Sequence, residues 1–156
     1  MASERPARAP GGLGGGRREA RERALHLLYE ADQRSCRVED VIAAQTIAPD
    51  EYTAAVLVGV AAERAAIDAS IARLAHGWTL ERMPAMDRLI MEIALYELGH
   101  RHDVPTAVVL NEATELANTY STDDSGRFVN GVLATAAVEL RPDGSTGSGD
   151  TVDDDR

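Results

Sequence analysis

Cysteine, lysine and aromatic residues are scarce or missing in this chain of 156 residues. Its one cysteine, Cys36, excludes an intramolecular disulfide framework and the zinc sites that need cysteine ligands in pairs. The longest strongly apolar run, residues 52–62, is shorter than the roughly 18–20 residues that cross a bilayer, and the N-terminus lacks the apolar core of a signal peptide. We therefore expect a cytoplasmic protein without membrane association, long enough to bury about 70% of its unfolded surface in a core.

Positive charge comes from arginine alone and is concentrated near the N-terminus. The chain has 16 arginines and 26 acidic residues, which gives a net charge of −10. Residues 5–23 hold six arginines and two glutamates, net +4, whereas residues 24–156 hold 10 arginines and 23 acids, net −13. The sequence thus predicts a short basic head, residues 5–23, on an acidic body.

Composition divides the chain into three segments. Residues 1–16 contain two prolines and a glycine-rich run, and residues 142–156 are rich in glycine, serine and aspartate, so we expect a disordered basic arm and a disordered acidic tail. Between them, residues 17–141 show helical spacing of apolar residues and no convincing alternation with period two. The sequence predicts one all-α domain whose core is built mainly from leucine, isoleucine, valine, methionine and alanine.

Prolines, glycines and capping residues set the expected helix boundaries. The predicted helices cover about 17–33, 38–45, 49–76, 85–99, 106–120 and 128–141, with a brief turn at 79–83. We expect Pro49 to open the third helix and Thr106 to cap the fifth. Gly131 lies inside the last helix, where glycine costs about 1 kcal/mol, and we expect a neighbouring helix to pack closely against it.

Patterns for catalysis or cofactor binding are weak. The glycine run at 11–16 follows no predicted strand and lacks the lysine of a phosphate-binding loop. His100 and His102, two positions apart, do not share a helix face and so do not form a metal pair. Cys36 is interpreted as a bystander thiol. The sequence therefore predicts a protein that is not an enzyme and uses no cofactor or metal.

The basic head offers a better candidate site. Arg17 and Arg21 are four residues apart on the first predicted helix, and Arg18 lies beside them. Guanidinium groups bind phosphates and stack on unpaired bases, which suits single-stranded RNA. The alternative is a solvated helix face on which these arginines pair with Glu19 and Glu22. Arginine content alone does not decide between the two.

Several strings in residues 17–141 resemble the NusB transcription antitermination factor family. They are REARERALHLLY at 18–29, DRLIMEIALYEL at 87–98, DVP at 103–105, NEA at 111–113, ELA at 115–117, DS at 124–125 and FVNGVL at 128–133. The resemblance implies an all-α fold of about seven helices in two packed subdomains, without catalysis. It also implies binding to the boxA element of ribosomal RNA leader transcripts, together with a small-subunit ribosomal protein, in the antitermination complex on RNA polymerase.

By position, the resemblance assigns RNA contacts in two places. One is the basic head, and the other is the start of the last helix; the six residues are Arg17, Arg18, Arg21, Asp124, Arg127 and Phe128. Glu19 stands where many members have a third basic residue. Phe128, the only phenylalanine, could pack in the core or stack on a base.

The acidic body suggests a site for the basic ribosomal protein. Residues 81–115 carry seven acids and three arginines, net −4, and solubility could explain the same charge. The candidate partner contacts are Glu81, Glu92, Glu97, Glu112 and Glu115. Two alternative functions stay open. One is a helical protein-interaction adaptor with weak or no RNA binding, which Glu19 and the net charge favour. The other is an enzyme appendage like the NusB-like domain of some ribosomal RNA cytosine methyltransferases, which the chain length disfavours. A homodimer is also possible.

Overall fold

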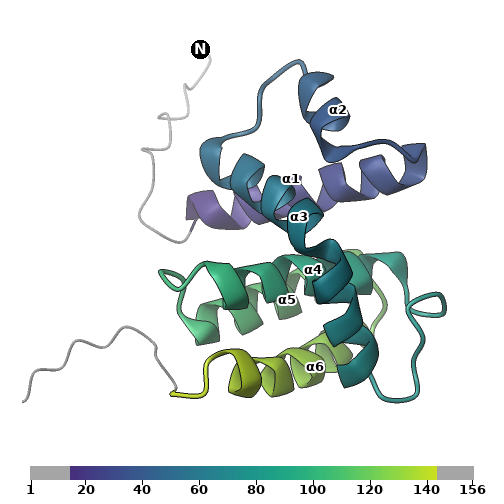
Figure 1. The fold of residues 1–156 in the computed structure, drawn as a ribbon, viewed down its shortest axis with the longest axis vertical. Coiled ribbons are helices and arrows are strands. Elements are labelled where there is room, and N and C mark those ends of the chain that lie inside the picture. The colour runs from purple at the N-terminus through teal and green to yellow at the C-terminus, as the bar shows by residue number, and fades with distance from the viewer. Residues whose placement is uncertain (1–14, 144–156) are drawn as a thin grey trace, which may run out of the picture.

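The computed structural model describes residues 15–143, which form α-helices and no strand (Figure 1). The six helices of this part are α1 (Gly15–Arg34), α2 (Val38–Ala43), α3 (Glu51–Leu74), α4 (Ala85–His100), α5 (Thr106–Tyr120) and α6 (Ser125–Leu140). The all-α prediction is confirmed. The count is six rather than about seven, because residues 79–83 form only a turn in which the amides of Arg82 and Met83 both bond the Thr79 carbonyl.

Most of the two predicted terminal arms lies outside the described residues. Where they overlap the structure, Gly15 and Gly16 already belong to α1, and Pro142 and Asp143 form a turn after α6. Helix α1 therefore begins two residues before its predicted start. None of the helices within residues 15–143 is long and apolar enough to cross a membrane.

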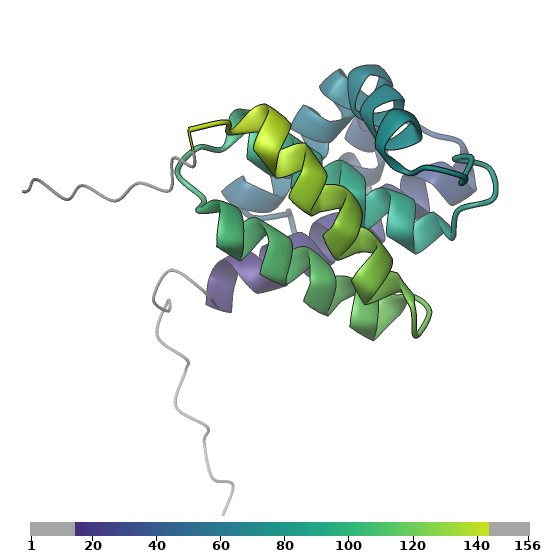
Figure 2. The ribbon, with the colours of Figure 1, turned by 90° about the horizontal axis from the view of Figure 1, so that it is seen from below.

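Helix α4 lies at the centre and contacts α1, α3, α5 and α6. The first three helices form one subdomain and the last three form the other, with the C-terminal part of α3 reaching α6 (Figure 1). A view from below shows α5 and α6 side by side (Figure 2). A continuous aliphatic core, with Leu28, Leu57, Ile90, Leu98 and Leu133 all at most 1% exposed, holds the two subdomains together.

Two helix starts differ from the prediction. Asp50, rather than Pro49, caps α3, because its Oδ1 accepts a hydrogen bond from the Thr53 amide at 2.7 Å. Thr106 is the first residue of α5 instead of its cap, and the cap position is Pro105. The start of α5 has no side-chain cap hydrogen bond, and the Thr106 hydroxyl accepts a hydrogen bond from Arg141 Nη1 at 3.1 Å.

Two helical glycines have opposite surroundings. Gly59 lets α3 approach α4 closely, because a Cβ at this position would lie 2.1 Å from Cε2 of Tyr96. At Gly131 an added Cβ would meet nothing within 4 Å. The prediction that a neighbouring helix packs against Gly131 is therefore wrong, and this residue faces open space on α6.

Candidate nucleic-acid interface

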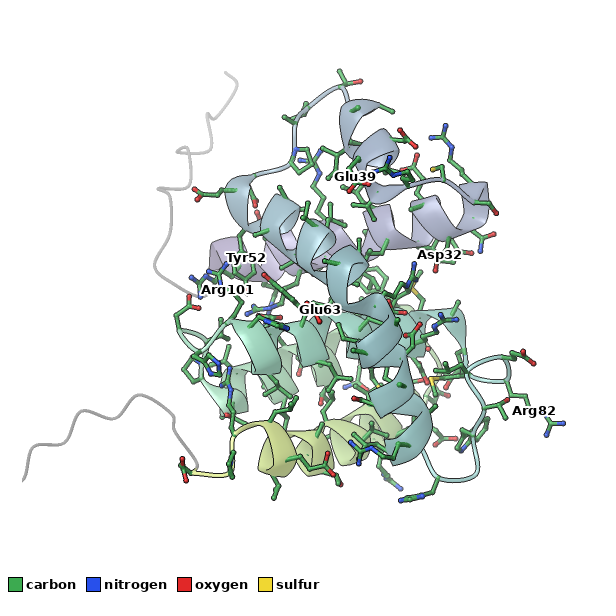
Figure 3. All side chains as sticks on the ribbon, in the orientation of Figure 1. Asp32, Glu39, Tyr52, Glu63, Arg82 and Arg101 are labelled. Carbon is green, nitrogen blue, oxygen red and sulfur yellow. The ribbon has the colours of Figure 1, made fainter. Side chains whose placement is uncertain are left out.

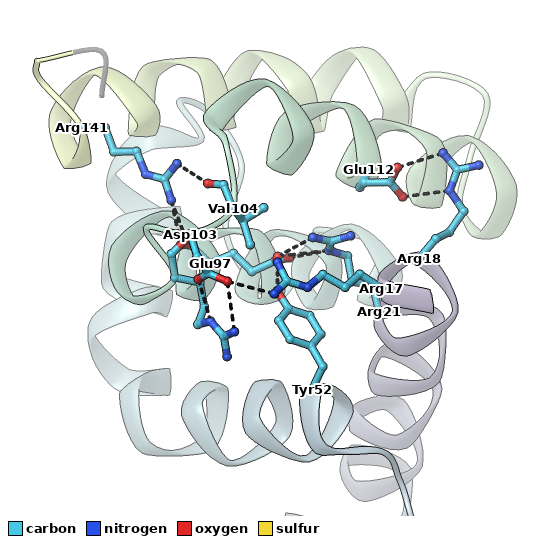
Figure 4. A network of polar contacts seen from close by, with 10 residues as sticks. Arg17, Arg18, Arg21, Tyr52, Glu97, Asp103, Val104, Glu112 and Arg141 are labelled. Atoms are coloured by element: carbon cyan, nitrogen blue, oxygen red, sulfur yellow. Dashed lines mark hydrogen bonds and ion pairs between the residues drawn. The ribbon is translucent and has the colours of Figure 1, made fainter. Parts of the chain in front are cut away.

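The part of the basic head that the structure describes, residues 15–23, lies on the first turns of α1 and faces the connection between α4 and α5. Arg17 Nη2 lies 2.9 Å from Asp103 Oδ2. Arg18 donates through Nε and Nη2 to both carboxylate oxygens of Glu112 on α5, each at 2.9 Å (Figure 4). Both arginines are partly exposed, Arg18 by about half of its side chain. Two guanidinium groups are thus held at the surface by carboxylates of another segment.

Arg21 differs from its two neighbours, because it is buried. It is 2% exposed and donates to Glu97 of α4 at 2.8 and 2.7 Å, while the Tyr52 hydroxyl donates to the same carboxylate at 2.5 Å. Burial on its own lowers the pKa of Arg21, but the hydrogen bond and charge of Glu97 outweigh it, so the pKa is raised and the cation persists. Arg21 anchors α1 on α4, and a direct phosphate contact by Arg21 does not fit this structure.

Tyr52 of α3 gathers three arginines around its ring. The guanidinium carbons of Arg17 and Arg101 lie 4.7 and 4.8 Å from the ring centroid, and that of Arg21 lies at 5.8 Å. Figure 3 shows Tyr52 and Arg101 close together at the same end of the molecule. Burial, followed by the charge of Glu97, raises the pKa of Tyr52, so the ring carries no competing negative charge at neutral pH.

Asp103 joins two of these arginines at the surface. Arg101 Nε donates to its Oδ1 at 3.1 Å, and Arg17 bonds its other oxygen. The hydrogen bond from Arg101, with that from Arg17, lowers the pKa of Asp103 to about 2, so it is ionised at any working pH. Sequence reasoning missed Arg101, Tyr52 and Asp103 as members of this site, because they meet Arg17 only in the folded chain.

Arg141 fixes the position of the α4–α5 connection. Arg141 is buried, with 4% of the residue exposed. Its guanidinium donates hydrogen bonds of 2.7 to 3.1 Å to four backbone carbonyls, those of Glu97, Leu98, Arg101 and Val104. The last carbonyls of a helix lack partners within that helix, and a cation there also suits the helix dipole. Arg141 thereby holds the loop that carries Arg101 and Asp103 (Figure 4).

The five glutamates predicted to bind a basic partner differ in exposure. Glu81 and Glu115 are exposed, whereas Glu112 is 9% exposed and pairs with Arg18. Glu92 and Glu97 are 0% and 1% exposed. These last two cannot contribute to a partner surface in this fold, because their carboxylates are enclosed between helices and already pair with arginines.

Glu92 belongs to a second polar cluster, which contains Asp32, Arg64, Asp68 and Arg88. Arg64 of α3 donates to both oxygens of Asp32 on α1 at 2.8 and 2.7 Å, and its Nε lies 2.9 Å from Glu92 Oε2. Arg88 donates to Asp68 at 2.8 Å and to Glu92 at 3.2 Å. Burial raises the pKa of Glu92 to about 7, against the opposing charge of Arg64. The cluster ties α1, α3 and α4 together.

The predicted contacts at the start of the last helix lie together on α6. Asp124 and Arg127 are exposed, and Phe128 is half-buried, with one part against the core and another near Trp78. The Ser121 hydroxyl donates to buried Asp87 of α4 at 2.5 Å, which fixes the α5–α6 turn. The structure thus leaves one cation, the two carboxylates of Asp123 and Asp124, and one aromatic ring accessible at this end of α6.

Tyr120 connects the two groups of predicted RNA contacts. It ends α5 four residues before Asp124, and its ring packs edge-on against His26 of α1 with centroids 4.9 Å apart. His26 and Tyr120 thus connect α1 to the end of α5, which precedes the start of α6 in the chain. The structure defines an all-α class of two packed subdomains, with arginines on the first turns of its first helix.

Comparisons with known proteins give the family. Residues 18–138 match the NusB family. The transcription antitermination protein NusB of Saccharopolyspora erythraea is 47% identical over 129 residues, covering 79% of this chain and 87% of the relative. That of Acidothermus cellulolyticus is 49% identical over 122 residues, covering 76% and 84%. Among solved structures, NusB of T. maritima superposes with a TM-score of 0.72 at 29% identity, covering 79% of this chain and 91% of that one. The chain belongs to the NusB family of transcription antitermination factors.

Proposed function

We propose that this chain is a non-enzymatic, cytoplasmic RNA-binding factor that recognises boxA-type single-stranded RNA of ribosomal RNA leader transcripts. In this proposal it acts together with a small-subunit ribosomal protein, within the antitermination machinery on RNA polymerase. Membership of the NusB family supports the role in transcription. The observation that carries RNA binding is the pair of surface arginines, Arg17 and Arg18, whose counterions are exchangeable carboxylates.

The two pairs differ in how easily a phosphate can replace the carboxylate. The side chains of Arg17 and Asp103 are 31% and 48% exposed, whereas in the other pair Arg18 is 51% exposed and Glu112 only 12%. An exposed pair such as Arg17–Asp103 contributes roughly 0 to 1 kcal/mol, so a phosphate can replace its carboxylate at little cost. Displacing Arg18 costs more, because the largely buried Glu112 carboxylate then loses its cation. The Arg21–Glu97 pair, at 3% and 2% exposure, is not exchangeable in this sense, because breaking a buried pair costs roughly 3–5 kcal/mol.

The start of α6 supplies a second set of contacts in this proposal. Arg127 is an exposed cation for a phosphate, and Asp124 is an exposed acceptor for amino groups on base edges. Phe128 offers part of its ring. With Arg17 and Arg18, the interface then engages three or four phosphates. This number of contacts predicts only weak RNA binding by the chain alone, because the acidic body repels RNA.

A basic partner protein fits the remaining exposed acids. Glu81 and Glu115 are exposed, and Glu112 and Asp103 become available when RNA takes their arginines. A positively charged ribosomal protein would reduce the repulsion between the acidic body and RNA. A homodimer stays a prediction from the resemblance.

The proposal is tested by fluorescence anisotropy with a labelled boxA RNA and the double variant Arg17→Glu, Arg18→Glu. Its matched control is Arg73→Glu, which reverses an exposed arginine paired with Glu139 far along α3. We expect the double variant to lose binding while it keeps its helical circular dichroism, and the control to bind nearly as the unchanged chain does. For the unchanged chain, log K should fall with log salt at a slope of about −2 to −3.

Equal binding by the double variant and the control would refute the assignment of the basic head. Absence of RNA binding by the unchanged chain, both alone and with the ribosomal protein, would favour the adaptor function instead.

A further inference from the structure

Trp78, the only tryptophan of the chain, is half exposed beside Phe128. The residue is 51% exposed, and its ring centroid lies 6.0 Å from that of Phe128, with the two planes inclined at 54°. Because the planes are inclined, the two rings form an open corner rather than a closed stack. Part of the indole therefore faces solvent next to a residue of the proposed RNA interface.

The backbone around Trp78 is held in place. Its amide donates to the Ala75 carbonyl at 3.0 Å, and the preceding Gly77 has a φ of +80°, which glycine adopts without strain. Ala75 and Met83, on either side in the chain, are 2% and 5% exposed in the core. The connection between α3 and α4 is thus anchored at both ends without the indole, so anchoring the loop does not account for its position.

The polar surroundings favour a nucleic acid base over an apolar protein segment as the occupant. Exposed Arg127 precedes Phe128 on α6, exposed Asp123 and Asp124 lie just before this helix, and exposed Glu81 and Arg82 follow in the same loop as Trp78. Figure 3 shows Arg82 pointing away from the body of the molecule. An apolar partner would have to desolvate these charges, whereas RNA presents a flat base for the rings and phosphates for the two arginines.

We propose that Trp78 and Phe128 form a stacking platform for one unpaired base of the RNA. The base lies on the exposed face of the indole, Phe128 contacts its edge, and Arg127 or Arg82 pairs with a neighbouring phosphate. This inference rests on the proposed function, and it extends the interface from the start of α6 to the α3–α4 connection. It also gives the accessible part of Phe128 a use that core packing alone does not supply.

The test uses the intrinsic fluorescence of the unchanged chain, because a single tryptophan reports on this site alone. Unlabelled boxA RNA is titrated while tryptophan emission and acrylamide quenching are followed, and a labelled RNA gives the binding curve by anisotropy in parallel. We expect the emission to be quenched by stacking and protected from acrylamide, with the same midpoint as the anisotropy curve.

Two substitutions then measure the contribution of stacking. Trp78→Leu should weaken RNA binding about 5- to 140-fold, since base stacking on an aromatic side chain contributes roughly 1–3 kcal/mol. Trp78→Phe should restore most of the affinity, because a phenyl ring still stacks. Val138→Ala, at another exposed apolar residue of α6, serves as the control and should leave binding unchanged.

The outcomes separate this inference from the proposed function. RNA binding by anisotropy with unchanged tryptophan emission and quenching would overturn the platform and leave RNA binding in place. No RNA binding by the unchanged chain would overturn both. A change of emission on adding the ribosomal protein alone, without a further change on adding RNA, would overturn the platform and make Trp78 a protein contact.

Discussion

Removing the negative charges of Asp103 and Glu112 should tighten RNA binding by this chain alone. These two carboxylates hold Arg17 and Arg18 at 2.9 Å, so RNA phosphates must displace them before the arginines can pair with RNA. The substitutions Asp103→Asn and Glu112→Gln keep the size and shape of the side chains, remove the charge and replace one acceptor oxygen with an NH2 donor. The double variant therefore weakens the hold of both side chains on the arginines and removes their repulsion of phosphate.

Two contributions set the expected magnitude. Each ion pair that no longer needs to be broken contributes about 0.5 kcal/mol if it is exposed, which is a lower bound for the pair of the largely buried Glu112. A carboxylate about 7 Å from an incoming phosphate repels it by about 0.6 kcal/mol in water. Each substitution should then favour RNA binding by about 1 kcal/mol, and the two together by about 2 kcal/mol, or about 30-fold in affinity at low salt. Asp103 also pairs with Arg101, so its substitution makes one more cation available.

The assay is anisotropy of a labelled boxA RNA at low and at moderate salt. The control is Glu139→Gln, which removes the same charge from another bidentate surface pair, with Arg73 at 3.0 and 2.7 Å. We expect the double variant to bind more tightly than the control, with a difference that narrows as salt screens the charges. Equal affinities for the double variant and the control at low salt would refute the view that Asp103 and Glu112 compete with RNA.

Three further predictions concern the fold. Arg21→Ala should lower the free energy of unfolding by roughly 3–5 kcal/mol, measured by urea denaturation, because it leaves Glu97 buried without its main cation. Gly59→Ala should destabilise the protein, since its Cβ would meet the Tyr96 ring, whereas Gly131→Ala should stabilise it by up to about 1 kcal/mol in the same assay, because open space surrounds this helical position. Folding raises the pKa of Glu92 from an ordinary value of 4.5 to about 7, so the folded chain binds this proton more tightly than the unfolded chain does. The stabilising contribution of Glu92 is therefore present below about pH 4.5 and is lost as the pH rises through about 7. Urea unfolding between pH 4.5 and 8 should show this decline, and Glu92→Gln should remove it; an identical pH profile for the variant would contradict the assignment.

The helices could be predicted from the sequence because each depends on local spacing. The apolar pattern places all six helices within about three residues of where the structure has them. The predicted last helix holds Phe128, and in the structure this helix begins at Ser125. The turn at 79–83 contains too few residues for a helix to form. Gly131 was misread because its low helix propensity is visible in the sequence, whereas the space around it is not.

The candidate site could be predicted only in part, because its contacts join distant residues. Arg18 and Glu112 are 94 positions apart, and Arg21 and Glu97 are 76 apart. In the sequence, Arg18 and Arg21 look equivalent. Glu97 is the signal that could have separated Arg21 from Arg18. Like Glu92, it interrupts the apolar run of α4, and residues 89–98 of this helix are all buried. Acidic residues enclosed in such a helix need cationic partners, and Arg21 is one of the few that α1 can supply.

The contrast between Arg21 and its two neighbours affects how this surface can change during evolution. Three arginines within five positions carry different constraints, because one closes the junction of the two subdomains and the others face water. Substitutions at Arg17, Arg18, Asp103 or Glu112 can adjust affinity for a ligand in small steps while the fold persists. A substitution at Arg21 has to be accompanied by a change at Glu97. Homologues with a different ligand preference should therefore differ at the exposed positions of α1, those of Arg17 and Arg18, while buried Arg21 stays paired with Glu97.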